Sequence, residues 1–361
     1  MLFSDRCRII LLMKDENYYR ERDIKNLEKI ERLKGDLPYF IEEFFLGIEN
    51  RTSTLTRLNY AYDLRVFFDF LTKKKFRGKS IEDLDFIDLE CVTNTDIELF
   101  LSYLSNYEYN GVRESCNERA KARKLSTVRS MFKYFFNKGR ISVDNAAKVA
   151  LPKLHDKEII RLEINEVADL LNTAENGAGM SPRQKSAHEK TKIRDVAILT
   201  LFLGTGIRIS ELIGLNNDDI DFTNNAFKVT RKGGNQTILY FSDEVSDALA
   251  RYLAEKEDNH CMDEPALFLS SFQPKRISVR AVEELVKKYS RIISPLKKIS
   301  PHKLRSTYGT QLYRETKDIY IVADVLGHKD VNTTKKHYAA ISEDIRRSVK
   351  DAVKLREKDN E

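Results

Sequence analysis

The sequence feature that most constrains the fold is a stripe of apolar residues at helical spacing between residues 121 and 137. Its members recur every three or four positions, as one side of an α-helix requires: Leu125, Val128, Met131, Phe132 and Phe135. Gly139 follows and is typical of a helix end. Comparable stripes over residues 17–48, 54–71 and 95–104, the first interrupted at Gly35 and Pro38, predict a helical first part of the chain.

The opposite side of the helix over 121–137 carries cations and short hydroxyl residues. A solvated surface would explain this pattern, and so would a face that binds DNA phosphates. The hydroxyl residues favour the second interpretation, because hydroxyl and cationic groups both bond phosphate oxygens. We therefore predict that DNA is bound by Arg123, Ser126, Arg129 and Lys133.

The second part of the chain mixes helices with strands. Residues 145–153 are typical of a linker, so we expect domains over 1–152 and 153–361. The polar stretch 173–190 predicts a surface loop, and the apolar stretch 195–203 predicts a buried helix. Two strand-like runs, 226–230 and 236–241, flank a Gly-Gly-Asn turn and predict a hairpin with Lys232 at its tip. The predicted fold class is mainly α with a small antiparallel sheet.

Composition narrows the class of protein less than these patterns do. At 361 residues the chain is long enough for about two domains. A net charge of +6 is compatible with a basic DNA-binding face, and equally with a charge-rich protein that has no polyanionic partner. Four scattered cysteines predict reduced thiols, and no apolar run approaches the ~20 residues of a membrane span. We expect a cytoplasmic protein without a membrane partner; Met13 is an alternative start, which would make the preceding residues an unstructured extension.

The residues after position 300 point to chemistry on a phosphate. His302 and Arg305 lie three positions apart, so they share one face of a helix and can present a proton carrier and a fork of N–H donors together. Leu326-Gly327-His328 follows, and Tyr338 adds a nucleophile. The pattern contains no metal-ligand cluster. It therefore predicts phosphoryl transfer without a metal and without a cofactor.

A glycine-rich turn contributes the second arginine. Gly204-Thr205-Gly206 follows the buried helix, and Arg208 then opens the next helix with Glu211 three residues later on the same face. On their own, these two residues would be a local surface ion pair. Arg208 and Glu211 precede Lys232 and the residues after position 300, and together with them they can instead belong to a phosphate-binding site.

With these motifs the chain resembles the tyrosine recombinase (phage integrase) family, and within it the Xer-type members. The resemblance rests on residues 204–212, on Lys232, on His302-Lys303-Leu304-Arg305, on Leu326-Gly327-His328 and on Tyr338, which span the second domain in the family's order. The first domain matches more loosely, through Thr54, Tyr60 and Asp63-Leu64. The resemblance implies a helical core-binding domain followed by a mixed α/β catalytic domain.

The resemblance also implies a role for each residue. Arg208 and Arg305 bind the scissile phosphate, Tyr338 attacks phosphorus, His302 is the base, Lys232 protonates the leaving 5′-oxygen, and His328 donates a hydrogen bond to a phosphate oxygen. Glu211 orients Arg208 or His302. Tyr338 follows His328 by ten positions, one more than the Xer-type spacing, so we expect an unusual path between them.

The predicted function is site-specific recombination of DNA through a 3′-phosphotyrosyl intermediate, of the Xer type that resolves chromosome dimers. The expected partner is double-stranded DNA with a specific recombination site, bound by a homotetramer on two sites. The alternatives are a phage or transposon integrase, a nicking–closing enzyme resembling type IB topoisomerases, and a catalytically silent DNA-binding protein.

Overall fold

The computed structural model describes residues 2–154, 160–231, 234–328 and 331, with side chains from residue 18 onward. The chain divides into two compact units, Met1–Lys157 and Glu158–Glu361. The boundary expected from the sequence, after residue 152, lies a few residues earlier. In the described ranges both units are mainly helical and each contains one small antiparallel sheet, which confirms the predicted fold class.

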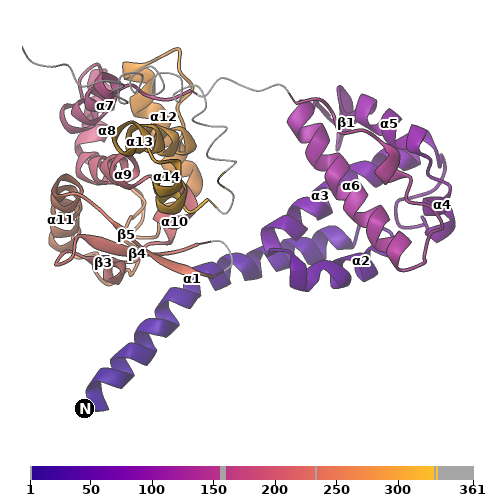
Figure 1. Ribbon diagram of the computed structural model, residues 1–361, viewed down its shortest axis with the longest axis horizontal. Coiled ribbons are helices and arrows are strands. Elements are labelled where there is room, and N and C mark those ends of the chain that lie inside the picture. Colours follow the sequence, from indigo (N-terminus) through magenta and orange to yellow (C-terminus); the bar gives the residue numbers. More distant parts are fainter. Residues whose placement is uncertain (1, 155–159, 232–233, 329–330, 332–361) are drawn as a thin grey trace, which may run out of the picture. The chain divides into compact units, whose positions relative to one another are not determined.

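The first unit is built from helices with one short hairpin (Figure 1). In chain order its elements are α1 (Leu2–Lys34), α2 (Ile41–Ile48), the 3₁₀-helix η1 (Glu49–Arg51), α3 (Thr54–Lys74), α4 (Phe86–Glu90), α5 (Asn94–Tyr103), β1 (Tyr107–Tyr109), β2 (Val112–Glu114), α6 (Glu118–Asn137) and the 3₁₀-helix η2 (Ala146–Lys148).

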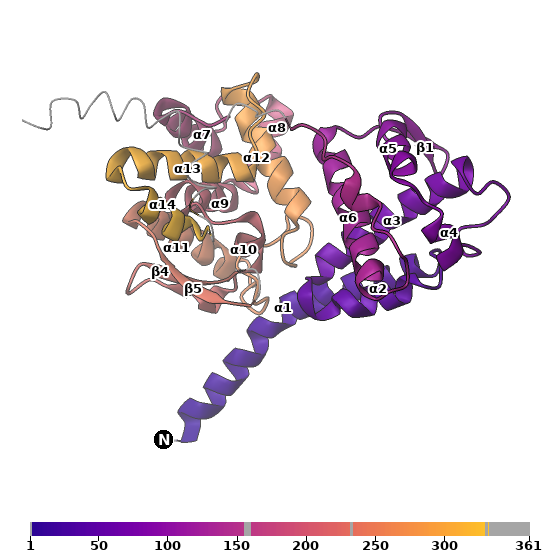
Figure 2. The same cartoon turned by 45° about the vertical axis from the view of Figure 1, so that its right-hand side comes forward.

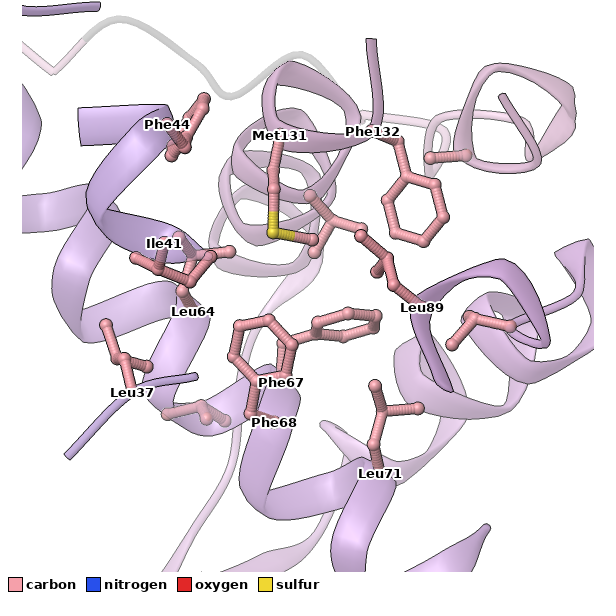
Figure 3. Packing of buried hydrophobic residues seen from close by; sticks show 14 of the residues in the cluster. Leu37, Ile41, Phe44, Leu64, Phe67, Phe68, Leu71, Leu89, Met131 and Phe132 are labelled. Atoms are coloured by element: carbon pink, nitrogen blue, oxygen red, sulfur yellow. The ribbon is translucent and has the colours of Figure 1, made fainter. Parts of the chain in front are cut away.

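Apolar side chains from several helices meet in the core of this unit. Figure 3 shows Ile41 of α2, Phe67 of α3, Leu89 of α4 and Met131 of α6 pointing toward one another. The whole apolar stripe predicted over 121–137 is buried, which confirms that α6 packs this side into the core. Aromatic rings make much of the contact, and the rings of Phe67 and Phe132 meet edge-on.

Local signals set the helix ends in this unit. α1 ends before Gly35, and α2 begins after Pro38, as the sequence predicted. Thr93 and Asp96 form a capping box at the start of α5: the Thr93 hydroxyl accepts from the Asp96 N–H, and the Asp96 carboxylate accepts from the Thr93 N–H. These bonds satisfy N–H groups that the first helical turn leaves without partners.

Other details of the first unit differ from the sequence-based predictions. α1 begins at Leu2, so the first residues are helical and not an unstructured extension. The hairpin of β1 and β2 was not predicted. The expected linker over 145–153 is wrong in part, because Ala146 and Val149 are buried in the core of the unit.

The second unit combines helices with a three-stranded sheet (Figures 1 and 2). Its described elements are α7 (Ile164–Asn176), α8 (Pro182–Glu189), α9 (Lys192–Thr205), α10 (Ile209–Gly214), the 3₁₀-helix η3 (Asn217–Asp219), β3 (Ile220–Asp221), β4 (Ala226–Thr230), β5 (Gln236–Tyr240), α11 (Asp243–Asp258), α12 (Val279–Ile293), α13 (Pro301–Thr316) and α14 (Ile319–Leu326).

α9 is the central helix of this unit and packs against α7, α11 and α13. Its residues Ala197–Phe202 are all buried, which confirms the predicted buried helix. The sheet has the antiparallel order β3-β4-β5 and lies at one side of the unit, away from α7 and α12 (Figures 1 and 2). β4 and β5 form the predicted hairpin, with Thr230 paired to Gln236.

The surface loop predicted over 173–190 is wrong. α7 continues to Asn176, and α8 occupies most of the remaining stretch. Ser181 caps α8 by accepting from the Gln184 N–H, and Pro182 stands at the first helical position, where its missing N–H costs nothing. The polar composition of this stretch therefore reflects a capped, solvent-facing helix that contributes His188 to the interior.

A buried polar network joins α8, α9 and α12. The Tyr289 hydroxyl donates to Asp195 (2.8 Å) and accepts from Lys288 Nζ (2.9 Å). His188 Nδ1 lies 3.1 Å from the same hydroxyl. Because that hydroxyl has given its one proton to Asp195, Nδ1 must carry the imidazole proton. Nε2 is buried without a hydrogen-bond partner among the described residues.

Burial, and then the charge of Lys288, lowers the pKa of His188 below its ordinary value of about 6.5. We expect this shift to leave the free energy of unfolding unchanged above about pH 6.5 and to lower it below that pH. The unfolded chain binds a proton there that the folded chain does not. Each unit of pKa difference corresponds to about 1.4 kcal/mol.

This pH dependence can be measured by calorimetry of the full chain between neutral and mildly acidic pH. His188→Asn retains an N–H donor near Nδ1 but does not titrate in this range, so it should remove part of the slope. The same change at the exposed His260 is the control for removing a histidine elsewhere in this unit. An unchanged slope in His188→Asn would contradict the interpretation.

Candidate functional site

The turn between α9 and α10 positions the first predicted arginine. Gly206 ends α9 with a left-handed backbone (φ +62°), and a Cβ atom there would lie 2.4 Å from the Tyr308 ring. Glycine is therefore required both by conformation and by the close approach of α13. Arg208 follows as the N-cap residue of α10, so the turn directs it to the start of that helix.

Glu211 orients Arg208. Its buried carboxylate accepts from Arg208 Nη1 at 2.7 Å and from the Arg208 backbone N–H at 3.0 Å. The predicted pair is therefore real, and the contact of Glu211 is with Arg208. The Arg208 side chain remains 35% exposed while that of Glu211 is only 4% exposed, so the guanidinium is the member of the pair that a ligand can reach.

The second predicted arginine arrives from α13. Arg305 is buried, and its Nη1 donates to the Gly206 carbonyl at 2.5 Å while its Nη2 donates to the Leu326 carbonyl. Arg208 Nη2 donates to the same Leu326 carbonyl (3.1 Å) and to that of Gly327 (2.8 Å). The two guanidiniums from distant parts of the sequence are thus side by side at the end of α14.

The backbone hydrogen bonds at the end of α14 explain why its last carbonyls bind these arginines. The His328 N–H donates to the Ala323 carbonyl and the Gly327 N–H to the Asp324 carbonyl, both at 2.8 Å, with Gly327 left-handed (φ +60°). This is a Schellman ending, which leaves the last carbonyls of the helix without helical donors. Guanidiniums satisfy them and also complement the negative end of the helix dipole.

The histidines lie at helix ends in the same unit. His302 is exposed in the first turn of α13, directly after Pro301, and His328 follows the end of α14 and is half-buried. The backbone bond of His328 to Ala323 places it next to the carbonyls that bind Arg208 and Arg305. Lys232 and Tyr338 lie outside the described residues, as does most of the run from His328 to Tyr338 whose spacing was expected to be unusual.

Arg231 was not singled out from the sequence. Its Nη2 donates to the Val325 carbonyl of α14 at 3.2 Å, and its guanidinium lies against Gly327. The signal that could have identified it is its place beside Lys232 in the predicted hairpin, but the sequence does not show that the hairpin reaches α14.

The predicted DNA-binding face of α6 is partly solvent-exposed. Arg123, Ser126 and Lys133 are exposed, with Ser126 donating back to the Ala122 carbonyl of its own helix. Arg129 differs: its guanidinium donates to the carbonyls of Ala146 and Val149 and so attaches η2 and the following residues to α6.

Asp63 of α3 organises the start of this face. Its carboxylate is buried and accepts from Arg123 Nη1 (2.6 Å), Lys124 Nζ (3.0 Å) and the Thr127 hydroxyl (3.0 Å). Lys124 is buried with it, whereas Arg123 keeps about half of its side chain exposed. A buried acid therefore compensates a buried lysine and aligns an exposed arginine.

The remaining surface features lie away from these residues. A cavity of about 290 Å³ is lined by parts of α9, α11 and residues 269–274 and includes none of the predicted site residues. In the described ranges, no group of three or more His, Cys, Asp or Glu residues is placed to hold a metal ion. No helix in the same ranges is long and apolar enough to cross a membrane.

Comparison with known proteins gives consistent matches along the chain. Residues 161–344 match the Phage integrase family, and residues 41–139 match the N-terminal SAM-like domain of phage integrases. The tyrosine recombinase XerC of Caldanaerobacter subterraneus is 36% identical over 321 residues, which cover 86% of this chain and 85% of that protein. The tyrosine recombinase XerS of Streptococcus sanguinis is 30% identical over 351 residues, covering 85% and 93%.

Solved structures share the fold at lower identity. The Tn1549 transposon integrase in complex with circular intermediate DNA matches with a TM-score of 0.61 at 19% identity, covering 84% of this chain and 96% of that one. The XerH site-specific recombinase bound to a palindromic difH substrate matches with a TM-score of 0.60 at 17% identity, covering 82% and 80%.

Replacing Asp63 by alanine should destabilise the first unit by about 3–5 kcal/mol, because Lys124 is then buried without its partner. The ion pair of Asp36 with Arg65 (2.6 Å), in which the Asp36 side chain is 54% exposed and that of Arg65 is 23% exposed, provides a control. Asp36→Ala should cost less than about 1 kcal/mol. Calorimetric melting of the full-length variants compares the two, and equal losses would refute the role given to Asp63.

Proposed function

Since the chain belongs to the phage integrase family and is a site-specific tyrosine recombinase of the Xer type, we propose that it cuts and rejoins DNA through Tyr338. The Tyr338 oxygen forms a bond to phosphorus as the bond from phosphorus to the 5′-oxygen breaks. The product is a 3′-phosphotyrosyl link and a free 5′-hydroxyl. Attack by that hydroxyl reverses the step and reseals DNA, so the bond energy is conserved.

The observation that carries this assignment is the convergence of Arg208 and Arg305 on the Leu326 carbonyl. Two guanidiniums at one place repel each other unless an anion compensates them. Glu211 and the end of α14 supply only part of that compensation, so the site retains positive charge. A phosphate diester fits this charge, and its pentacoordinate transition state, which carries more charge on the non-bridging oxygens, fits it better.

The position of His302 supports its proposed role. His302 stands in the first turn of α13, where the free N–H groups and the dipole of a helix favour an anion. There it can accept the proton of the Tyr338 hydroxyl, whose ordinary pKa is about 10. His328 donates to a phosphate oxygen. Lys232 supplies the proton that the leaving 5′-oxygen requires.

Double-stranded DNA with a specific recombination site is the proposed substrate, bound by a homotetramer on two such sites. We further propose that the biological reaction is the resolution of chromosome dimers. Similarity to recombinases named XerC and XerS over most of the chain supports this assignment. Exchange of strands between two sites in vitro would separate recombination from mere nicking and closing of one duplex.

Tyr338→Phe should abolish the covalent intermediate. The substrate is a duplex that the protein selects from random DNA, nicked near the cleavage position so that the freed end diffuses away. Wild type should accumulate a protein–DNA adduct on a denaturing gel, because resealing is prevented. Tyr320→Phe, which alters an exposed tyrosine of α14, is the matched control and should retain the adduct. An adduct in Tyr338→Phe would overturn the assignment of the nucleophile.

The face of α6 gives a separate expectation for DNA binding. Arg123→Ala and Lys133→Ala should each reduce the slope of log K against log salt by about 0.9, the value for one phosphate contact. Arg129→Met should lower the melting temperature of the first unit, since this variant loses the bonds to the carbonyls of Ala146 and Val149. Slopes that stay at the wild-type value in both alanine variants would remove α6 from the interface.

A further inference from the structure

Arg231 precedes the proposed general acid Lys232 in the sequence, and its contacts with α14 have no role in the reaction described above. We propose that Arg231 is a positioning residue: it holds the β4–β5 hairpin against the end of α14, and so supports the proton transfer proposed for the next residue in the sequence, Lys232. This inference rests on the proposed function, in which Lys232 protonates the leaving oxygen. It assigns to the hairpin a fixed attachment within the phosphate-binding site.

Three consecutive carbonyls at the end of α14 accept hydrogen bonds from three arginines. Val325 accepts from Arg231, Leu326 from Arg208 and Arg305, and Gly327 from Arg208. The hairpin residue therefore binds the same short stretch of backbone as the two phosphate-binding residues. Any displacement of this stretch moves all three guanidiniums together.

The Arg231 guanidinium lies close against Gly327 at the end of α14. A Cβ atom at Gly327 would lie 2.0 Å from Arg231 Nη1 and 2.4 Å from Cζ. The guanidinium thus occupies the space that a side chain would need. Gly327 also has the left-handed backbone (φ +60°) that the Schellman ending requires. Gly327 therefore both ends the helix and leaves room for the Arg231 guanidinium.

The hydrogen bonding of Arg231 argues against a role in stability alone. Its Nε is buried without a hydrogen-bond partner in the part of the chain that the structure describes. An unsatisfied buried donor destabilises the folded state, which offsets much of what the bond to the Val325 carbonyl contributes. A fixed location of the guanidinium is what this arrangement achieves.

The backbone of Arg231 is also bonded within the hairpin. The Arg231 N–H donates to the Asn235 carbonyl (2.8 Å), and the Gly234 N–H donates to the Arg231 carbonyl (3.1 Å). Arg231 is thus held by its backbone to the hairpin and by its side chain to α14. Lys232 is the next residue in the sequence, and adjacent Cα atoms are about 3.8 Å apart, so the attachment of Arg231 would limit the range that Lys232 can search. Its long flexible stem then has fewer positions to search before the ammonium reaches the leaving oxygen.

DNA in which sulfur replaces the bridging 5′-oxygen distinguishes this role from others. A thiolate leaves without a proton, because a thiol has a pKa of about 8.5, far below that of an alcohol. Loss of the general acid should therefore slow cleavage of ordinary DNA and leave cleavage of the sulfur-bridged DNA close to the wild-type rate. A defect in phosphate binding or in folding should slow both.

We expect Arg231→Met to slow covalent adduct formation on ordinary DNA by roughly 10²-fold, at the lower end of what general acid catalysis supplies. On the sulfur-bridged DNA its rate should return close to that of wild type, as for Lys232→Ala. Arg231→Lys, which retains charge and stem but not the flat guanidinium, should show a smaller defect with the same rescue. Circular dichroism confirms that each variant is folded.

Arg276→Met is the matched control, because Arg276 also donates to backbone carbonyls of this unit, those of Ile213 (2.6 Å) and Leu215 (2.8 Å). Any loss in this variant should be equal on the two substrates. An equal loss in the Arg231 variants, or no loss, would overturn the inference while Lys232→Ala is still rescued. If wild type forms no adduct on either substrate, the proposed function itself fails.

Discussion

The site in the second unit depends on carbonyls at the end of α14 that accept no hydrogen bond from a helical N–H group. The Schellman ending at Gly327 leaves these carbonyls free of helical donors, and arginines from α10, α13 and the β4–β5 hairpin satisfy them. A structural requirement of one short helix thereby gathers positive charge from three separate segments. Glu211 compensates part of that charge and orients Arg208, which remains accessible to a phosphate.

A buried carboxylate has the corresponding role in the first unit. Asp63 accepts hydrogen bonds from Arg123, Lys124 and Thr127, so it joins α3 to α6 and aligns the basic face of α6. The cations on one helix consequently differ in what they do. Arg123 and Lys133 are exposed to solvent, whereas Arg129 binds backbone carbonyls of its own unit. Sequence spacing alone places all of them on similar sides of the helix.

Several predictions that depend on local sequence were confirmed. The apolar stripe of α6, the breaks at Gly35 and Pro38, and the β4–β5 hairpin follow from spacing and backbone preference. The predicted loop over 173–190 was wrong because polar composition concealed a capped helix. The expected linker over 145–153 was wrong in part, because Ala146 and Val149 are buried against residues far away in the sequence.

The sequence by itself determined which residue types are present and in what order. This was enough to identify the family and to predict roles for Arg208, Glu211 and Arg305. Only the tertiary structure decided that Arg231 joins them at α14 and that Arg129 binds its own backbone. The physical reason is that a guanidinium can bond any carbonyl within reach. Which carbonyls are left unpaired, and which side chains can reach them, is known only once the helices have packed.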